Sequence, residues 1–151
     1  MKNYLIRLLM GMALATASWG APMLTISAPH QTGGAGQTVG WGFTLTADED
    51  YWVSVIGSYL DMQTNPSVGT YEDRIGVQGG PADFSLAPQA LDWTQEFDAA
   101  GFTGLGSFLI VPFAPIGSLN SAEVVVQLEY FSANPMTCGS CYVGFEELRH
   151  P

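Results

Sequence analysis

The sequence predicts an all-β protein in which two antiparallel sheets pack against each other as a sandwich. Several short stretches alternate apolar with polar or small residues, and this period of two is that of a β-strand with one buried face. Glycine and proline fall between the stretches, and no stretch after residue 20 has the period of a helix. About eight strands, spaced as in a sandwich or barrel, are therefore expected.

The clearest alternation lies between residues 38 and 46, where apolar side chains occupy every second position from Val39 to Leu45. Residues 51–60 follow an acidic turn at 48–50, so we expect the two strands to form a hairpin. The second strand is apolar on both faces, which is typical of a strand in the middle of a sheet. One of its faces is expected to carry Trp52, Ile56 and Leu60, and the other Tyr51, Val53, Val55 and Tyr59.

The remaining strands are expected on both sides of this hairpin in the sequence. Their predicted ranges are 23–27, 70–77, 84–88, 91–98, 107–111, 122–130 and 141–148. With Trp41 facing a core between two sheets, the arrangement is that of an immunoglobulin-like sandwich. A jelly roll, which also has about eight strands in two sheets, is the alternative.

The first 20 residues have the composition of a secretory signal peptide. Lys2 and Arg7 precede an uncharged apolar run at 8–17, and small residues follow it. The run is about ten residues long, whereas a helix that spans a membrane needs about 20. Cleavage is expected after Ala17 or Gly20. The mature chain would then be a single domain over residues 21–151, secreted to the extracellular space or the periplasm and not inserted in a membrane.

Removal of the signal peptide leaves a strongly acidic chain. Its only Lys or Arg residues are then Arg74 and Arg149, two against 14 carboxylates, which gives a formal net charge of −12. Nucleic acids and anionic membranes are both bound through clustered Lys and Arg side chains. We therefore expect no nucleic-acid partner, and the acidity favours solubility.

Cys138 and Cys141 form a C-x-x-C motif between two predicted strands. Such a motif can be a redox-active dithiol beside a helix N-terminus, or half of a zinc site. No helix is predicted here, and His30 and His150 lie near opposite ends of the mature chain. In an exported chain, the expected state is a disulfide that closes the turn before the last strand. We expect no cofactor.

A calcium-stabilised adhesion domain is a third, less favoured expectation, which comes from the acidic residues. Calcium takes about six to eight oxygen ligands, and Asp61 with Glu72 or Asp73 would supply some of them if the intervening loop folds back. Neither an EF-hand nor a calcium-repeat spacing occurs in the sequence. Carboxylates on exposed turns and strand faces, without a metal, are therefore the favoured interpretation.

The sequence does not predict an enzyme. It contains no G-x-S-x-G motif, and neither His lies in the body of the predicted fold, where a triad base is expected. A pair of carboxylates needs a cleft to hold a substrate. A small sandwich without a long loop offers little room for one.

Tyr51, Trp52 and Tyr59 are the candidate ligand-binding residues. Exposed aromatic rings on a β-sandwich can stack on sugar rings as they do on other apolar faces. Adjacent strand residues point to opposite faces, so Tyr51 and Trp52 cannot both lie in the core. A carbohydrate-binding module is therefore the alternative function.

The segments GQTVGWGFTLT at 36–46 and DYWV at 50–53 resemble secreted immunoglobulin-like proteins of bacteria, many of which carry a PEP-CTERM (exosortase) sorting signal. GLGSF at 104–108 and the strand at 123–130 are similar to the same group. The resemblance implies an extracellular or surface-matrix role without naming a ligand. After Leu148 there is no Pro-Glu-Pro motif, apolar helix or basic tail, so sorting by that route is not expected. The expected function is a non-enzymatic secreted or cell-envelope β-sandwich, either structural or an interaction module, whose partner is an extracellular protein or a glycan.

Overall fold

The structure is a computed structural model that describes residues 21–75 and 85–150. These residues form ten β-strands and one 3-10 turn, Pro66–Val68, and all of the paired strands are antiparallel. The predicted all-β antiparallel class is confirmed. Across the two described ranges, no helix is long and apolar enough to cross a membrane. The predicted signal peptide, and the parts of two predicted strands at 76–77 and 84, lie outside the described residues.

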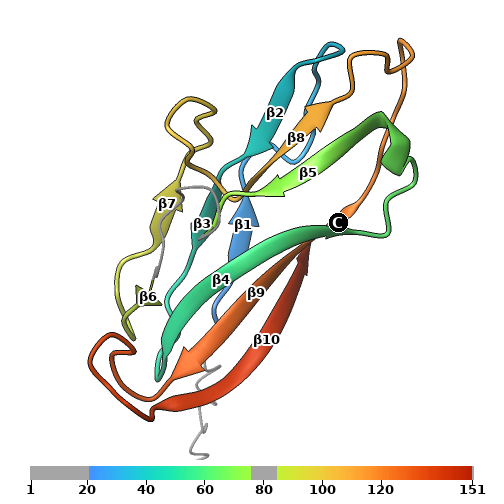
Figure 1. The fold of residues 1–151 in the computed structure, drawn as a ribbon. Coiled ribbons are helices and arrows are strands. Elements are labelled where there is room, and N and C mark those ends of the chain that lie inside the picture. Colours follow the sequence, from blue (N-terminus) through green and yellow to red (C-terminus); the bar gives the residue numbers. More distant parts are fainter. Residues whose placement is uncertain (1–20, 76–84, 151) are drawn as a thin grey trace, which may run out of the picture.

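The strands form three small sheets (Figure 1). The first has the order β1-β3-β7, with β1 at Leu24–Ile26, β3 at Phe43–Leu45 and β7 at Trp93–Gln95. The second has the order β2-β8-β5, with β2 at Thr38–Trp41, β8 at Gly106–Ile110 and β5 at Gly69–Asp73. The third has the order β10-β9-β4-β6, with β10 at Tyr142–His150, β9 at Glu123–Phe131, β4 at Trp52–Asp61 and β6 at Ser85–Leu86. The predicted two-sheet sandwich is therefore not confirmed in that form.

The strand predicted at 38–46 is divided at Gly42. Its first half, β2, pairs with β8, whereas its second half, β3, pairs with β1 and β7. A β-carbon at Gly42 would lie 2.6 Å from the carbonyl oxygen of Gln95. Glycine at this position therefore allows a neighbouring backbone to approach where the strand changes partners.

The predicted hairpin between this strand and the next is wrong, because β3 and β4 belong to different sheets. The side chains of Phe43 and Leu45 on β3, and of Val53 and Val55 on β4, are all buried in the same core cluster. The two strands thus face each other across the core instead of pairing edge to edge. The prediction that residues 51–60 lie in the middle of a sheet is confirmed, since β4 lies between β9 and β6.

A β-bulge in β4 reverses which side chains face the core. Val55 pairs with Leu128 and Gly57 with Gln127, so Ile56 is an extra residue in the ladder. Beyond the bulge, Tyr59 lies on the same side of the sheet as Trp52, because their partners on β9, Val125 and Phe131, are an even number of residues apart. The prediction that these two aromatic residues face opposite ways is therefore wrong.

The core lies between the first sheet and the four-stranded sheet. Its members come mainly from β1, β3, β4, β6 and β9, with Ile75 and Leu105 added from loops. Phe43, Leu45, Val53 and Leu128 have no exposed surface. Trp41, expected to fill the core, is half-buried and packs against it.

Candidate functional site

One face of the four-stranded sheet is turned away from the core, and we call it the outer face. Val126 and Leu128 of β9 belong to the core cluster. The alternate residues of β9, from Val125 to Phe131, therefore lie on the outer face, together with their partners on β4 and β10. Figure 1 shows β4, β9 and β10 side by side as one long curved layer.

Four aromatic side chains gather at one end of the outer face. They are Trp52, Phe131, Tyr142 and Phe145, and we call them the aromatic row. Phe131 pairs with Trp52 on one side and with Tyr142 on the other, while Phe145 pairs with Glu129. Tyr142 is 58% exposed and Phe145 is 49% exposed. The rings of Phe131 and Tyr142 meet edge to face, with centroids 5.9 Å apart. Neighbouring aromatic side chains that are left open to water in this way form a candidate interaction surface.

The structure does not bring the three predicted ligand residues together. Trp52 belongs to the aromatic row. Tyr51 points the other way and packs edge to face against Tyr130, with ring centroids 6.4 Å apart. Tyr59 shares the outer face with Trp52 but lies seven residues further along β4, about 20 Å away.

The opposite end of the outer face carries a charged cluster around Arg149. Its guanidinium group lies 2.8 Å from Asp61, 3.3 Å from Glu123 and 3.4 Å from Glu147. The Tyr59 hydroxyl donates a hydrogen bond to Glu147 at 3.2 Å. The hydrogen bond from Arg149, together with the one from the Met62 amide, holds the pKa of Asp61 below its usual range. Partial desolvation and the neighbouring Glu147 raise the pKa of Tyr59.

Asp73, a weak calcium candidate, lies in a hydrogen-bonded group that links β4 to β5. The Ser58 hydroxyl is 2.7 Å from both Asp73 Oδ1 and the Tyr71 hydroxyl, and 3.0 Å from the carbonyl oxygen of Leu105. The Ile75 amide also donates to Asp73 Oδ1, at 3.0 Å. Burial nevertheless raises the pKa of Asp73, and it raises the pKa of Tyr71 as well.

The three calcium candidates therefore have separate partners. Asp61 is paired with Arg149, Asp73 with Ser58, and Glu72 lies 3.5 Å from Arg74. Across residues 21–75 and 85–150 no group of three or more His, Cys, Asp or Glu side chains is placed to hold a metal ion.

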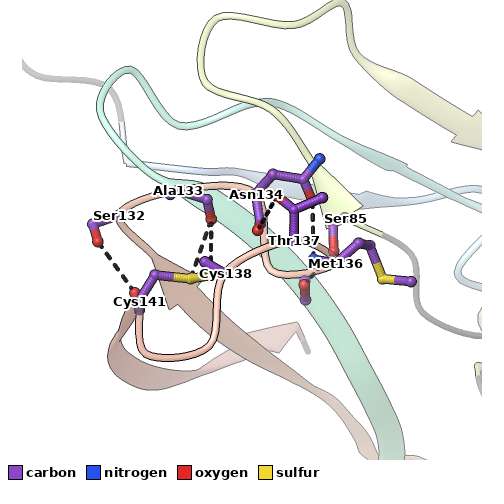
Figure 2. Close-up of a disulfide and its surroundings, with 9 residues drawn as sticks. Ser85, Ser132, Ala133, Asn134, Met136, Thr137, Cys138 and Cys141 are labelled. Atoms are coloured by element: carbon purple, nitrogen blue, oxygen red, sulfur yellow. Dashed lines mark hydrogen bonds between the residues drawn. A yellow bond between two sulfur atoms is a disulfide. The ribbon is translucent and has the colours of Figure 1, made fainter.

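Cys138 and Cys141 are joined by a disulfide in the loop between β9 and β10 (Figure 2). Their Cα atoms lie 5.9 Å apart. The Asn134 side chain accepts the Met136 amide at 2.9 Å, and its carbonyl accepts the amides of Thr137 and Cys138, each at 3.1 Å. Ser132 donates its amide to the Cys141 carbonyl at 2.8 Å, which closes the base of the loop.

Sequence reasoning missed Phe131, Tyr142 and Phe145 as surface residues. Phe131 ends a strand that was predicted, and the other two lie in the predicted last strand. A second bulge, between Tyr142 and Gly144, breaks the period of two in β10. The signal that would have identified the row is the cross-strand register, which depends on both bulges.

The outer face thus offers open aromatic rings at one end and a paired charge cluster at the other. No protein-family model, no curated protein and no solved structure matches the chain.

Proposed function

We propose that this chain is a non-enzymatic, secreted or cell-envelope β-sandwich that acts as an interaction module, with the aromatic row as its contact surface. The observation that carries the proposal is the exposure of Tyr142 and Phe145 beside Phe131 on a sheet face that points away from the core. Burial of that area against a partner is favourable, at about 25 cal/mol per Å² of apolar surface. The strongly acidic composition fits a partner that is not anionic.

We also propose that the three sheets form the two layers of an immunoglobulin-like sandwich. In this view β2 and β3 are one strand interrupted at Gly42, and β7 and β8 are its common antiparallel neighbour. The register supports this: residues 38–41 pair with 106–109, and residues 43–45 pair with 93–95, in the same direction. One layer would then be β1, β2–β3, β7–β8 and β5, and the other the four-stranded sheet.

Binding of the exported chain to isolated cell-envelope and extracellular-matrix material tests the leading function. The double variant Tyr142→Asp, Phe145→Asp should lose this binding, because it places two charges in the aromatic row. The matched control is Leu91→Asp, Phe113→Asp, which changes two exposed apolar residues in loops outside the four-stranded sheet. Retained binding by the first variant, with its fold intact by circular dichroism, would contradict the proposal.

The aromatic character of the row also favours the second candidate, a carbohydrate-binding module. Sugar rings stack on aromatic faces, whereas a protein partner has no such requirement. A glycan array should then show binding by the exported chain that disappears in Trp52→Ala. If the chain still binds matrix material after all polysaccharide has been removed from it, the partner is a protein and not a glycan.

A further inference from the structure

A cavity of about 680 Å³ lies at the opposite end of the fold from the disulfide loop. Its inner wall comes from β2 and β8, facing the ends of β4, β9 and β10, and its outer walls are the loops 29–35 and 114–122. In Figure 1 the second of these loops is the orange connection from β8 to β9. The volume lies within the range of about 300 to 1,000 Å³ that is usual for small-molecule sites.

The inner wall of the cavity is apolar. Its side chains are Val39 and Trp41 from β2, Phe108 and Ile110 from β8, and Leu60 and Val124 from the four-stranded sheet. The Trp41 indole nitrogen donates to the carbonyl oxygen of Pro29 at 3.3 Å, so its polar atom already has a partner. What Trp41 offers to an occupant is therefore apolar surface.

The outer walls carry polar as well as apolar side chains, but no Asp, Glu, Lys or Arg is among the described residues that line the cavity. This absence of carboxylates is notable in a chain with 14 acidic and four basic residues. His30 and His150, which are far apart in the sequence, both line the cavity, as does Asn120. An ionised ligand would find no fixed opposite charge here, and burial of an unpaired charge is costly.

Two further side chains at the rim, Ile116 and Leu119, are almost completely exposed. In the loop 114–122 the amides of Ala114, Ser118 and Ser121 donate to Val111, Pro115 and Thr64, which interrupts any row of open backbone groups there. An added strand would need a row of open backbone groups. A small apolar molecule needs only the apolar surface.

We propose that this cavity binds an uncharged, elongated apolar molecule with one hydrogen-bonding end, such as a long-chain alcohol. The apolar part lies against Trp41 and Phe108, and the polar end remains at the rim beside the imidazole and amide side chains. Ile116 and Leu119 lie beside the occupant at the mouth of the cavity. This site is separate from the aromatic row, so either can exist without the other.

Titration calorimetry of the exported chain with 1-decanol tests the proposal. Saturable binding is expected, and it should raise the melting temperature because the ligand binds only the folded state. Decanoate and decyltrimethylammonium should each bind at least about tenfold more weakly, since each carries a charge into an uncharged site. In nuclear magnetic resonance spectra, the indole signal of Trp41 should shift on addition of decanol, while that of Trp52 should not.

A matched pair of surface variants locates the site. Ile116→Asp places a carboxylate at the rim and should weaken decanol binding at least about tenfold. Leu91→Asp changes an equally exposed apolar loop residue outside the cavity and should leave the affinity unchanged. Three outcomes would overturn the proposal: no saturable binding of decanol, equal loss in both variants, or tighter binding of the ammonium probe.

Discussion

The guanidinium group of Arg74 lies over the ring of Phe102, with its central carbon 5.0 Å from the ring centroid. Phe97 contacts the same group, at 5.8 Å. Arg74 is only 4% exposed, and its Nε donates to the Ser107 hydroxyl at 3.0 Å. Its Nη1 atom is buried without a hydrogen-bond partner. Contacts with the two rings therefore hold the guanidinium group together with the Ser107 hydroxyl and with Glu72, which lies 3.5 Å away.

Replacement of Arg74 by alanine should destabilise the protein by about 2 to 4 kcal/mol, because it leaves a cavity beneath the two rings. Arg74→Met should lose less stability than Arg74→Ala, since it keeps an apolar stem and removes the buried nitrogen that has no hydrogen-bond partner. Urea unfolding followed by circular dichroism measures both.

Arg149→Met is the control for the loss of a positive charge. Arg149 and its carboxylate partners are partly exposed, so the expected change is much smaller than that of Arg74→Ala. If Arg74→Ala were no more destabilising than Arg149→Met, the ring contacts would not stabilise the fold.

The fold class followed from side-chain periodicity, because alternation depends only on one face of a strand being buried. β9 shows this best: it was predicted at 122–130 and lies at 123–131. The pairing of strands did not follow. β3 and β4 are neighbours in sequence with similar apolar patterns, and nothing in either pattern distinguishes edge-to-edge pairing from packing across a core.

The candidate site was only partly predictable for a related reason. Trp52 was identified, but its neighbours on the outer face come from β9 and β10, about 80 and 90 residues away in the sequence. Ile56 adds one residue to its ladder, and that single insertion moves Tyr59 to the opposite face from the one predicted.

Asp61 should contribute stability at neutral pH that is lost in acid. Its pKa is lowered in the folded protein, first by the hydrogen bond from Arg149, so the contribution is present above the unfolded pKa of about 3.9. This contribution disappears as the pH falls through the pKa that Asp61 has in the folded protein. The melting temperature of Asp61→Asn should therefore decrease less than that of the unsubstituted protein below about pH 4. Parallel curves for the two proteins would show that the ion pair with Arg149 does not stabilise the fold.

The contribution of Asp73 to stability should change with pH in the opposite direction to that of Asp61. Burial raises its pKa in the folded protein, so its stabilising contribution is present below about pH 3.9 and is lost as the pH rises through the raised value. Asp73→Asn keeps an oxygen to accept the hydrogen bond from Ser58 and carries no charge. Thermal unfolding should show that this variant gains stability relative to the unsubstituted protein as the pH rises from about 4 to about 7. A loss across that range would mean that the carboxylate is needed in its ionised form.

Gly42→Ala should destabilise the fold by about 1 to 3 kcal/mol, because the new β-carbon meets the backbone of the strand beside it. The carbonyl oxygen of Gln95 would lie 2.6 Å away and cannot rotate aside as a side chain could. Gly139→Ala is the matched control, since nothing lies within 4 Å of a β-carbon there. Urea unfolding should show almost no change for the control, and equal midpoints for the two variants would contradict the role assigned to Gly42.

The disulfide should contribute little to global stability although it closes a defined loop. A bond between Cys138 and Cys141 spans only three positions, and the entropic stabilisation from so short a loop is at most about 2 kcal/mol. The hydrogen bond from Ser132 to Cys141 and the turn at Asn134 hold the loop independently of the sulfurs. The double variant Cys138→Ser, Cys141→Ser should therefore unfold close to the unsubstituted protein in urea. Mass spectrometry of the protein purified without a reductant should show it lighter than its reduced form by two hydrogens, and two free thiols there would contradict the pairing. A large loss of stability in the double variant would instead show that the hydrogen bonds of the loop depend on the covalent link.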